Sequence, residues 1–191
     1  MTRNSATPSS PHTRPLPGDA VASNSALASM LRVNHAGEYG ATRIYAGQLA
    51  VLKHHALAPE LRHMAAQEQA HLAAFNTLLP AHRVRPSLLQ PIWHIAGFAL
   101  GAGTALMGAR AAMACTTAVE TVITEHYDAQ LAQPDIIADE LRTQIKTFRD
   151  EEMEHHDTAL QHDAEKAPGY TLLSGVIQAG CRAAIWLAAR V

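Results

Sequence analysis

The sequence predicts an all-α fold: a four-helix bundle with two additional apolar helices. Apolar residues form 48% of the 191 residues and aromatic residues only 5%, and this composition, in which alanine is abundant, favours helices over sheet. Along four long segments the apolar positions recur at spacings of three, four and seven, which is the period of one helix face. Glycine and proline gather between these segments. We therefore expect long amphipathic helices joined by short breaks.

The chain is long enough for one domain with a sizeable core but too short for two. Residues 1–22 are rich in Ser, Thr, Pro and Arg and show no helical period, so we expect a flexible tail before a single domain over residues 23–191. With Arg3 and Arg14 and no acidic residue before Asp19, the tail also fits a short organellar transit peptide. The formal net charge of −2 gives no basic footprint for nucleic acid, which we therefore exclude as a partner.

The first two predicted helices carry acidic and imidazole side chains on their apolar faces. The first covers residues 25–52, and Glu38 lies in register with its apolar residues. The second begins at a proline, a residue favoured in the first turn of a helix, and we expect Pro80 to end it. Glu68 and His71 fall within the apolar period of this second helix. Both helices thus place ionisable groups where the core should be.

Two later helices repeat this arrangement. One covers residues 113–131 and carries Glu120, and the next covers residues 137–159 and carries Glu152 and His155. In the first half of the chain a lone Glu precedes a Glu-x-x-His pair by 30 residues, and in the second half by 32. The two halves therefore look like one helical hairpin used twice.

Two further segments are strongly apolar. Residues 86–114 include Gly97 and Gly101, four positions apart, and we expect a buried or membrane-facing helical segment there. Its 18 residues from 92 to 109 approach the length of a membrane span, but a buried core helix or an interfacial helix fits the composition as well. The end of the chain, residues 170–191, predicts one more apolar helix.

A Glu and a His three positions apart on a helix point the same way and offer an oxygen and a nitrogen to one site. One such pair is a weak signal, because Glu60-x-x-His63 also matches the pattern. That pair lies about 80° away from the face of the next Glu-x-x-His pair on the same helix. We expect it on the surface.

The candidate metal site consists of the six residues that share the core register of the bundle helices: Glu38, Glu68, His71, Glu120, Glu152 and His155. Four carboxylates in one core would each face a desolvation penalty of roughly several kcal/mol and would repel one another. Two divalent cations would balance their charge, while the histidines would donate neutral nitrogens. Ferritin-like di-iron and di-manganese bundles use this ligand set, and mixed carboxylate and imidazole ligation suits either metal. A buried polar network without metal is the alternative.

Five stretches of the chain resemble a known family: LRVNHAGEYGATRIYAGQ (31–48), QEQAHLAAFN (67–76), CTTAVETVITEHYDAQL (115–131), FRDEEMEHHDTALQHDAE (148–165) and IQAGCRAAIWLAARV (177–191). They are similar to the demethoxyubiquinone hydroxylases of ubiquinone biosynthesis. The resemblance covers about residues 25–191 and includes all six candidate ligands. It is therefore more specific than the ligand pattern alone.

The resemblance implies a ferritin-like domain with two iron ions per chain, in which Glu68 and Glu152 are bridging carboxylates and Glu38 and Glu120 are terminal ones. The implied reaction is the O2-dependent hydroxylation of the ring of a polyprenyl methoxy-methyl benzoquinol, demethoxyubiquinol. Electrons would come from NADH or another external reductant. The sequence contains no G-x-G-x-x-G fingerprint for a dinucleotide.

Four other residues are candidates for roles near the metal. Tyr127 lies seven residues after Glu120 and so on the same helix face, where it could relay an electron or a proton, although a packed tyrosine with a bonded hydroxyl is an equal alternative. His126 points elsewhere by the same geometry, but its pairing with Tyr127 resembles the family's helix. His156 and Asp157 are candidate hydrogen-bond partners of the metal-binding histidines, since such histidines usually donate their second nitrogen to an acceptor.

A polyprenyl tail must leave the bilayer to reach the iron, so we favour an interfacial, substrate-admitting role for residues 86–114. The resemblance implies peripheral association with the bacterial cell membrane on its cytoplasmic side, or with the matrix side of the mitochondrial inner membrane. It also implies a lipid-binding accessory protein of the coenzyme Q complex as a possible partner.

Two other function classes use the same features. A ferritin-like peroxide reductase or ferroxidase would employ the same ligands on aqueous small molecules, and a lipid-binding scaffold could retain a vestigial site. The apolar segments at 86–114 and 170–191 favour the quinol hydroxylase, because an iron store has no need of them.

Overall fold

The computed structural model describes residues 25–133 and 138–191, so the expected flexible tail over residues 1–22 lies outside the described residues. Within them the chain forms helices and no strand, which confirms the predicted all-α fold. The elements are α1 (Ser25–Leu52), α2 (Ala58–Ala81), α3 (Gln90–Leu106), α4 (Ala109–Leu131), α5 (Asp139–Gln161), the short 3-10 helix η1 (Ala164–Lys166) and α6 (Tyr170–Ala188).

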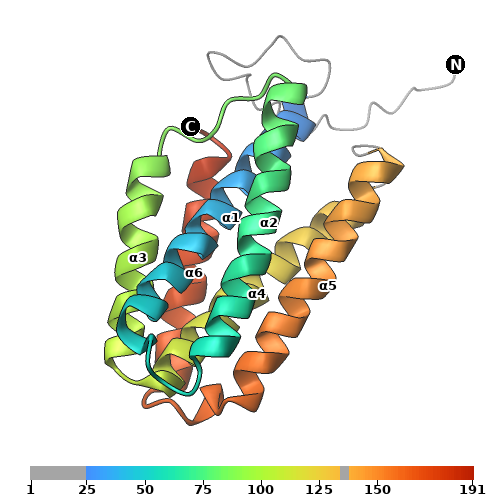
Figure 1. Ribbon diagram of the computed structural model, residues 1–191. Helices are drawn as coiled ribbons and strands as arrows, with labels where there is room; N and C mark the ends of the chain where they lie inside the picture. The colour runs from blue at the N-terminus through green and yellow to red at the C-terminus, as the bar shows by residue number, and fades with distance from the viewer. Residues whose placement is uncertain (1–24, 134–137) are drawn as a thin grey trace, which may run out of the picture.

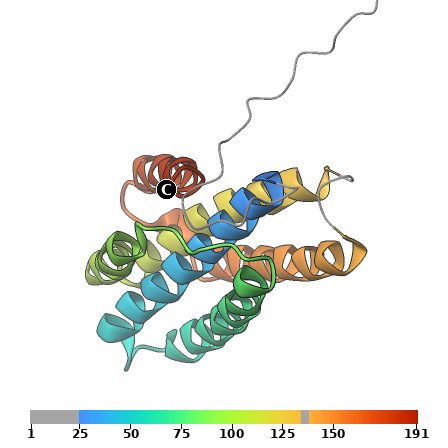
Figure 2. The same cartoon turned by 90° about the horizontal axis from the view of Figure 1, so that it is seen from above.

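Helices α1, α2, α4 and α5 form the ferritin-like four-helix bundle, and α3 and α6 are the two additional helices (Figures 1 and 2). The hairpin α1–α2 is followed by α3, which returns to pack on α1. The hairpin α4–α5 is followed by α6, which returns to pack on α4. The repeat predicted for two helical hairpins therefore extends to three helices in each half of the chain.

The apolar core of the bundle is divided into two clusters. One contains Leu31, Phe75 and Ile145, and the other contains Leu61 and Met113, all of them fully buried. Each bundle helix contributes to both clusters, and its candidate ligands lie between its two contributions. The polar site is thus enclosed by apolar packing at both ends.

The close approach of α3 to α1 depends on glycines at their crossing. A Cβ atom on Gly101 would lie 1.9 Å from the carbonyl oxygen of Ile44, and one on Gly47 would lie 2.2 Å from that of Phe98. Only a residue without a side chain permits backbone contact at this range. The pair Gly97 and Gly101 singled out in the sequence therefore belongs to a helix contact.

Two predicted boundaries are wrong. Helix α2 continues to Ala81, one residue past Pro80, because a proline in the last turn removes only one hydrogen bond and leaves the helix before it intact. Residues 86–114 do not form one helical segment, since α3 and α4 are separated by Gly108 at φ +115°. This backbone conformation is accessible to glycine and strained for other residues.

We expect Gly101→Ala to destabilise the protein by about 1–3 kcal/mol, because the new methyl group collides with the α1 backbone. The matched control is Gly103→Ala on the same helix, where nothing lies within 4 Å of the added atom. That variant should be stabilised by about 0.5–1 kcal/mol through helix propensity. Thermal unfolding measures both, and equal effects of the two substitutions would contradict the close contact.

Candidate metal centre

The six predicted ligands come together in the middle of the bundle, and each is at most 2% exposed. Their ligand atoms form two groups, and within each group these atoms lie within 4.8 Å of one another. The first group is Glu38, Glu68, His71 and Glu152, and the second is Glu68, Glu120, Glu152 and His155. Glu68 and Glu152 belong to both groups. This arrangement offers two adjacent cation positions with two carboxylates between them.

Both histidines turn the same ring nitrogen toward the carboxylates. Nδ1 of His71 lies 3.1 Å from Glu152 Oε1 and 3.4 Å from Glu38 Oε2. Nδ1 of His155 lies 3.0 Å from Glu152 Oε2 and 3.3 Å from Glu68 Oε1. A cation at either position would therefore be bound through Nδ1.

The outer nitrogen of each histidine is held by a residue from the opposite hairpin. Nε2 of His71 donates to Glu151 Oε2 at 2.5 Å, and Nε2 of His155 donates to Gln67 Oε1 at 3.0 Å. Sequence reasoning had suggested His156 and Asp157 for this role. These two residues instead bond to each other, at 3.1 Å between His156 Nδ1 and Asp157 Oδ1. The sequence of one helix does not show which residue of another helix will accept the hydrogen bond from the outer nitrogen of its histidine.

The electrostatics of the cluster show how costly four buried carboxylates are. Burial, followed by the charge of Glu152, raises the pKa of Glu68 and Glu120 well above the ordinary value of 4.5. Burial raises the pKa of Glu152 as well, but hydrogen bonds with His155 and His71 outweigh it and lower the value to about 2. Burial lowers the pKa of His71, and its bonds with the carboxylates outweigh burial and raise it to about 12.

Several carboxylate oxygens in the cluster accept no hydrogen bond from any described residue. Both oxygens of Glu68 and Oε2 of Glu120 are buried and lack a hydrogen-bond partner. A buried carboxylate oxygen that accepts no hydrogen bond is destabilising, and a divalent cation would supply the missing interaction. The donor set of carboxylates and imidazoles also suits iron or manganese. The residues present therefore fit a dinuclear metal centre.

Two buried tyrosines bind the outer carboxylates. The hydroxyl of Tyr127 donates to Glu38 Oε1, and that of Tyr45 donates to Glu120 Oε1 at 2.8 Å. Tyr127 was a candidate from the sequence, whereas Tyr45 was missed. The sequence could have indicated Tyr45, since it follows Glu38 by the same seven residues that separate Tyr127 from Glu120.

His126 lies beside the cluster rather than in it. It forms a buried network with two amide side chains, because Gln130 Nε2 lies 2.7 Å from His126 Nε2 and donates to Asn34 Oδ1 at 2.7 Å. Asn34 Nδ2 returns a bond to Gln130 Oε1 at 3.0 Å. Burial lowers the pKa of His126 to about 4, so the ring is neutral at physiological pH.

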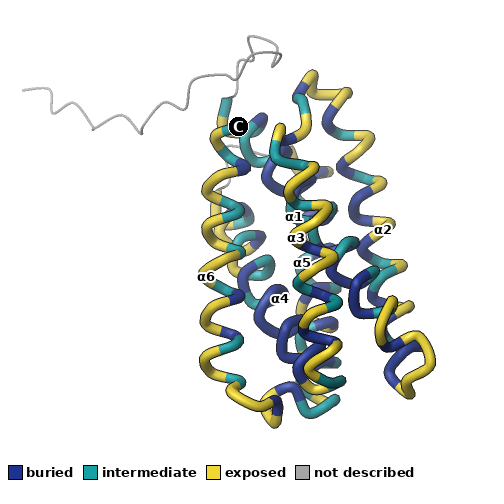
Figure 3. Tube along the Cα trace, turned by 90° about the vertical axis from the view of Figure 1, so that its left-hand side faces the viewer, coloured by how far each residue is buried: buried dark blue, intermediate teal, exposed yellow. Residues whose placement is uncertain are grey.

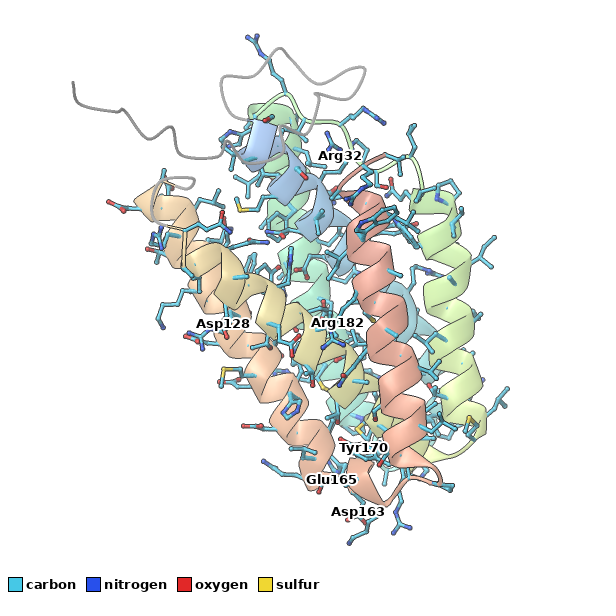
Figure 4. The ribbon with its side chains drawn as sticks, turned by 180° about the vertical axis from the view of Figure 1, so that it is seen from behind. Arg32, Asp128, Asp163, Glu165, Tyr170 and Arg182 are labelled. Carbon is cyan, nitrogen blue, oxygen red and sulfur yellow. The ribbon has the colours of Figure 1, made fainter. Side chains whose placement is uncertain are left out.

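An apolar pocket of ≈ 390 Å³ leads from the surface to this network and to the cluster. Its walls come from α1, α3, α4 and α6, and its mouth includes Val176, which is 63% exposed. Figure 4 shows Arg182 of α6 beside α4, where it donates to Glu125 Oε2 at 3.0 Å in an exposed ion pair. The polar side chains that line the pocket's buried end are Asn34, Glu38, His126 and Tyr127.

The third Glu-x-x-His pair stands apart from this site. His63 is exposed and Glu60 is partly exposed, and neither belongs to a group of possible metal ligands. The surface position expected for this pair is confirmed.

We expect the metal-free protein to release protons when it binds divalent cations. His71 has a pKa of about 12 and is therefore protonated at neutral pH until a cation replaces the proton on Nδ1. Metal affinity should thus increase with pH, by about tenfold per pH unit for each proton displaced. Calorimetric titration with Mn²⁺ in buffers of different ionisation enthalpy counts the protons, and an affinity independent of pH would contradict the assignment.

Comparison with known proteins places the chain in a family. The profile of the family described as "Ubiquinone biosynthesis protein COQ7" matches residues 25–188. A rat protein named NADPH-dependent 3-demethoxyubiquinone 3-hydroxylase, mitochondrial, is 57% identical over 169 residues, which cover 86% of this chain and 78% of the relative. The 3-demethoxyubiquinol 3-hydroxylase of Rhodospirillum rubrum is 53% identical over 181 residues, covering 92% and 83%.

A yeast relative is more distant. The 5-demethoxyubiquinone hydroxylase, mitochondrial, of Saccharomyces cerevisiae is 46% identical over 182 residues, which cover 86% of this chain and 78% of the relative. The match thus extends from mammals to bacteria and spans nearly all of the described bundle. This protein belongs to the COQ7 family of ubiquinone biosynthesis proteins.

Proposed function

We propose that this protein hydroxylates the ring of a polyprenyl methoxy-methyl benzoquinol, demethoxyubiquinol, in ubiquinone biosynthesis, using two iron ions per chain and O2. The relatives are named as hydroxylases of such quinones, so the protein is a monooxygenase of this pathway. The iron ligands are Glu38, Glu68, His71, Glu120, Glu152 and His155.

The observation that carries this proposal is the apolar pocket that leads to the carboxylate cluster. Glu38 belongs to both, since it lines the buried end of the pocket and offers a ligand atom to the first cation position. A prenyl chain fits the apolar walls, and the ring of the quinol then lies against the polar groups at the buried end. A ferroxidase or a peroxide reductase acting on aqueous small molecules would not require a pocket of this kind.

Iron, when bound, supplies the activation of O2 and the transfer of one oxygen atom to the ring, while two electrons and two protons reduce the other atom to water. The protein orients the ring and keeps water out of the pocket. Neutral His126, whose Nε2 is fixed by Asn34 and Gln130, lines the pocket, and we expect it to help orient the ring there. Tyr127 holds a proton beside Glu38 and can pass it between the ring and the cluster.

The electrons come from NADH or another external reductant. Several relatives carry NADPH-dependent in their names, which supports a nicotinamide as the source.

Membrane association accounts for the exposed apolar surface. Apart from Val51 and Met153, every exposed large apolar residue in the described part of the chain lies within residues 88–107 or 172–187, on or beside α3 and α6. Figure 3 shows exposed residues along the outer side of α6. These two helices also flank the pocket. We infer that this surface lies in the membrane interface, where a prenyl tail can enter directly.

Helix α6 is long and apolar enough to cross a membrane by length and composition, with a mean hydropathy of 1.3. It packs on α4, however, and Arg190 stacks over Trp186 at 3.8 Å near its end. A basic group over an exposed aromatic ring is typical of an interfacial position. We therefore propose a peripheral position on the cytoplasmic side of a bacterial cell membrane, with the matrix side of the mitochondrial inner membrane as the alternative.

The hydroxylation is tested with iron-loaded, chemically reduced protein, isotopically labelled O2 and a short-chain demethoxyquinol. We expect mass spectrometry to find one labelled oxygen atom in the product ring. Glu120→Ala should lose both iron and product, since it removes a ligand of the second cation position. An intact iron centre that forms no product would refute the proposed reaction.

Tyr127→Phe should retain iron but lower the turnover number by about 10²-fold or more, because it removes the proton beside Glu38 at the pocket. Tyr45→Phe removes the equivalent hydrogen bond to Glu120, away from the pocket lining, and should lower turnover much less. Single-turnover kinetics with quantified iron distinguish the two variants. Similar losses in both would argue against a special role for Tyr127.

The membrane position is tested by sedimentation with vesicles of phosphatidylcholine and phosphatidylglycerol. The double variant Ile95→Asp and Leu172→Asp places charges on α3 and α6, at side chains that are 71% and 75% exposed. We expect binding to fall by at least about tenfold through the lost apolar burial. Met153→Asp on α5 is the matched control and should bind as the unchanged protein does. Equal binding by all three proteins would refute the assignment of this surface.

A further inference from the structure

The repeat in the two halves of the chain extends beyond the six candidate ligands. In each half a tyrosine follows the first glutamate by seven residues, and a polar residue directly precedes the Glu-x-x-His pair. Four of these five matched positions hold the same residue type in both halves, and one does not. The matched pairs are Glu38 and Glu120, Tyr45 and Tyr127, Gln67 and Glu151, Glu68 and Glu152, and His71 and His155.

The contacts made by these added positions cross from one hairpin to the other. Each tyrosine donates to the first glutamate of the opposite half. Gln67 of α2 accepts from His155 of α5, and Glu151 of α5 accepts from His71 of α2. The matched residues of the two cation positions are therefore the same except at Gln67 and Glu151. One histidine is held by a neutral amide and the other by a carboxylate.

This difference changes what each histidine can offer to a cation. A hydrogen bond from an imidazole N–H to a carboxylate is charge-assisted, so it is shorter and stronger than one to an amide. It also makes the ring a better electron donor at its other nitrogen. Both acceptors lie within hydrogen-bond distance of the outer nitrogens of their histidines. Neither acceptor reaches a cation position itself.

We propose that Gln67 and Glu151 are positioning residues that make the two cation positions unequal. The position formed by Glu38, Glu68, His71 and Glu152 binds its cation more tightly and fills first, because Glu151 supports its histidine. The position with His155 fills second. Since Glu38 lines the pocket, the tighter position is also the one beside the substrate. This inference rests on the metal centre assigned under the proposed function.

The order of filling is measured by titrating metal-free protein with Mn²⁺ alone and following free Mn²⁺ by electron paramagnetic resonance. The unchanged protein should show two binding steps that differ by about 10- to 100-fold in affinity. Glu151→Gln gives both histidines a neutral acceptor, so the tighter step should weaken and the two steps should merge. Gln67→Glu gives both a carboxylate, so the weaker step should strengthen and again merge with the other.

Two further variants separate this effect from a loss of structure. The exchange Gln67→Glu with Glu151→Gln should restore two separate steps, which a general loosening of the bundle cannot do. Glu154→Gln removes the same charge from an exposed position on the same helix and should leave both steps unchanged. Circular dichroism verifies that each variant is folded. If Glu151→Gln does not fold, the Mn²⁺ titration of Gln67→Glu still tests the proposal.

The outcomes distinguish this inference from the proposed function. Two bound Mn²⁺ per chain with steps that Glu151→Gln and Gln67→Glu leave unchanged would overturn the inference and leave the metal centre intact. Failure of the unchanged protein to bind two cations would overturn both. The inference is supported if the two binding steps merge in each single variant and separate again after the exchange. Gln67 and Glu151 would then set the difference between the two Mn²⁺ affinities.

Discussion

Four carboxylates buried in one helical core are the constraint on which this molecule depends. Each is almost inaccessible to water, and several of their oxygens find no hydrogen-bond donor among the described residues. Burial and mutual repulsion raise the pKa of Glu68 and of Glu120, while hydrogen bonds with the carboxylates raise the pKa of His71 against the effect of burial. Two divalent cations would remove that conflict. The apolar clusters at both ends of the site enclose it.

The same bundle explains how an apolar substrate meets a polar centre. Helices α3 and α6 lie outside the bundle and flank a pocket whose buried end includes Glu38. Helix α3 reaches its place because glycines allow it to touch the backbone of α1. The outer faces of both helices are apolar and exposed, so the pocket opens where a membrane surface would lie. On the proposed function, substrate would enter at the exposed end of this pocket and react at its buried end.

The internal repeat gives the centre its symmetry, and one of the matched positions differs in charge between the two halves. Two equivalent hairpins supply equivalent glutamates, histidines and tyrosines, and each hairpin supports the ligands of the other. Each cation position therefore contains residues from both hairpins. Only Gln67 and Glu151 differ among the matched positions. A charge difference at the edge of a symmetric site is a small change that can still distinguish two metal ions.

The sequence by itself determined the all-α class, the six residues that meet in the core and the repeat that relates them, because residues three, four and seven apart on a helix share a face whatever surrounds them. The break at Gly108, the pocket and the crossed partners of the histidines were decided only by the tertiary structure. His156 and Asp157 looked plausible since they adjoin a ligand, yet Glu151 and Gln67 hold those nitrogens. Local geometry fixes the direction of a side chain from its own helix, but packing between helices decides what it meets.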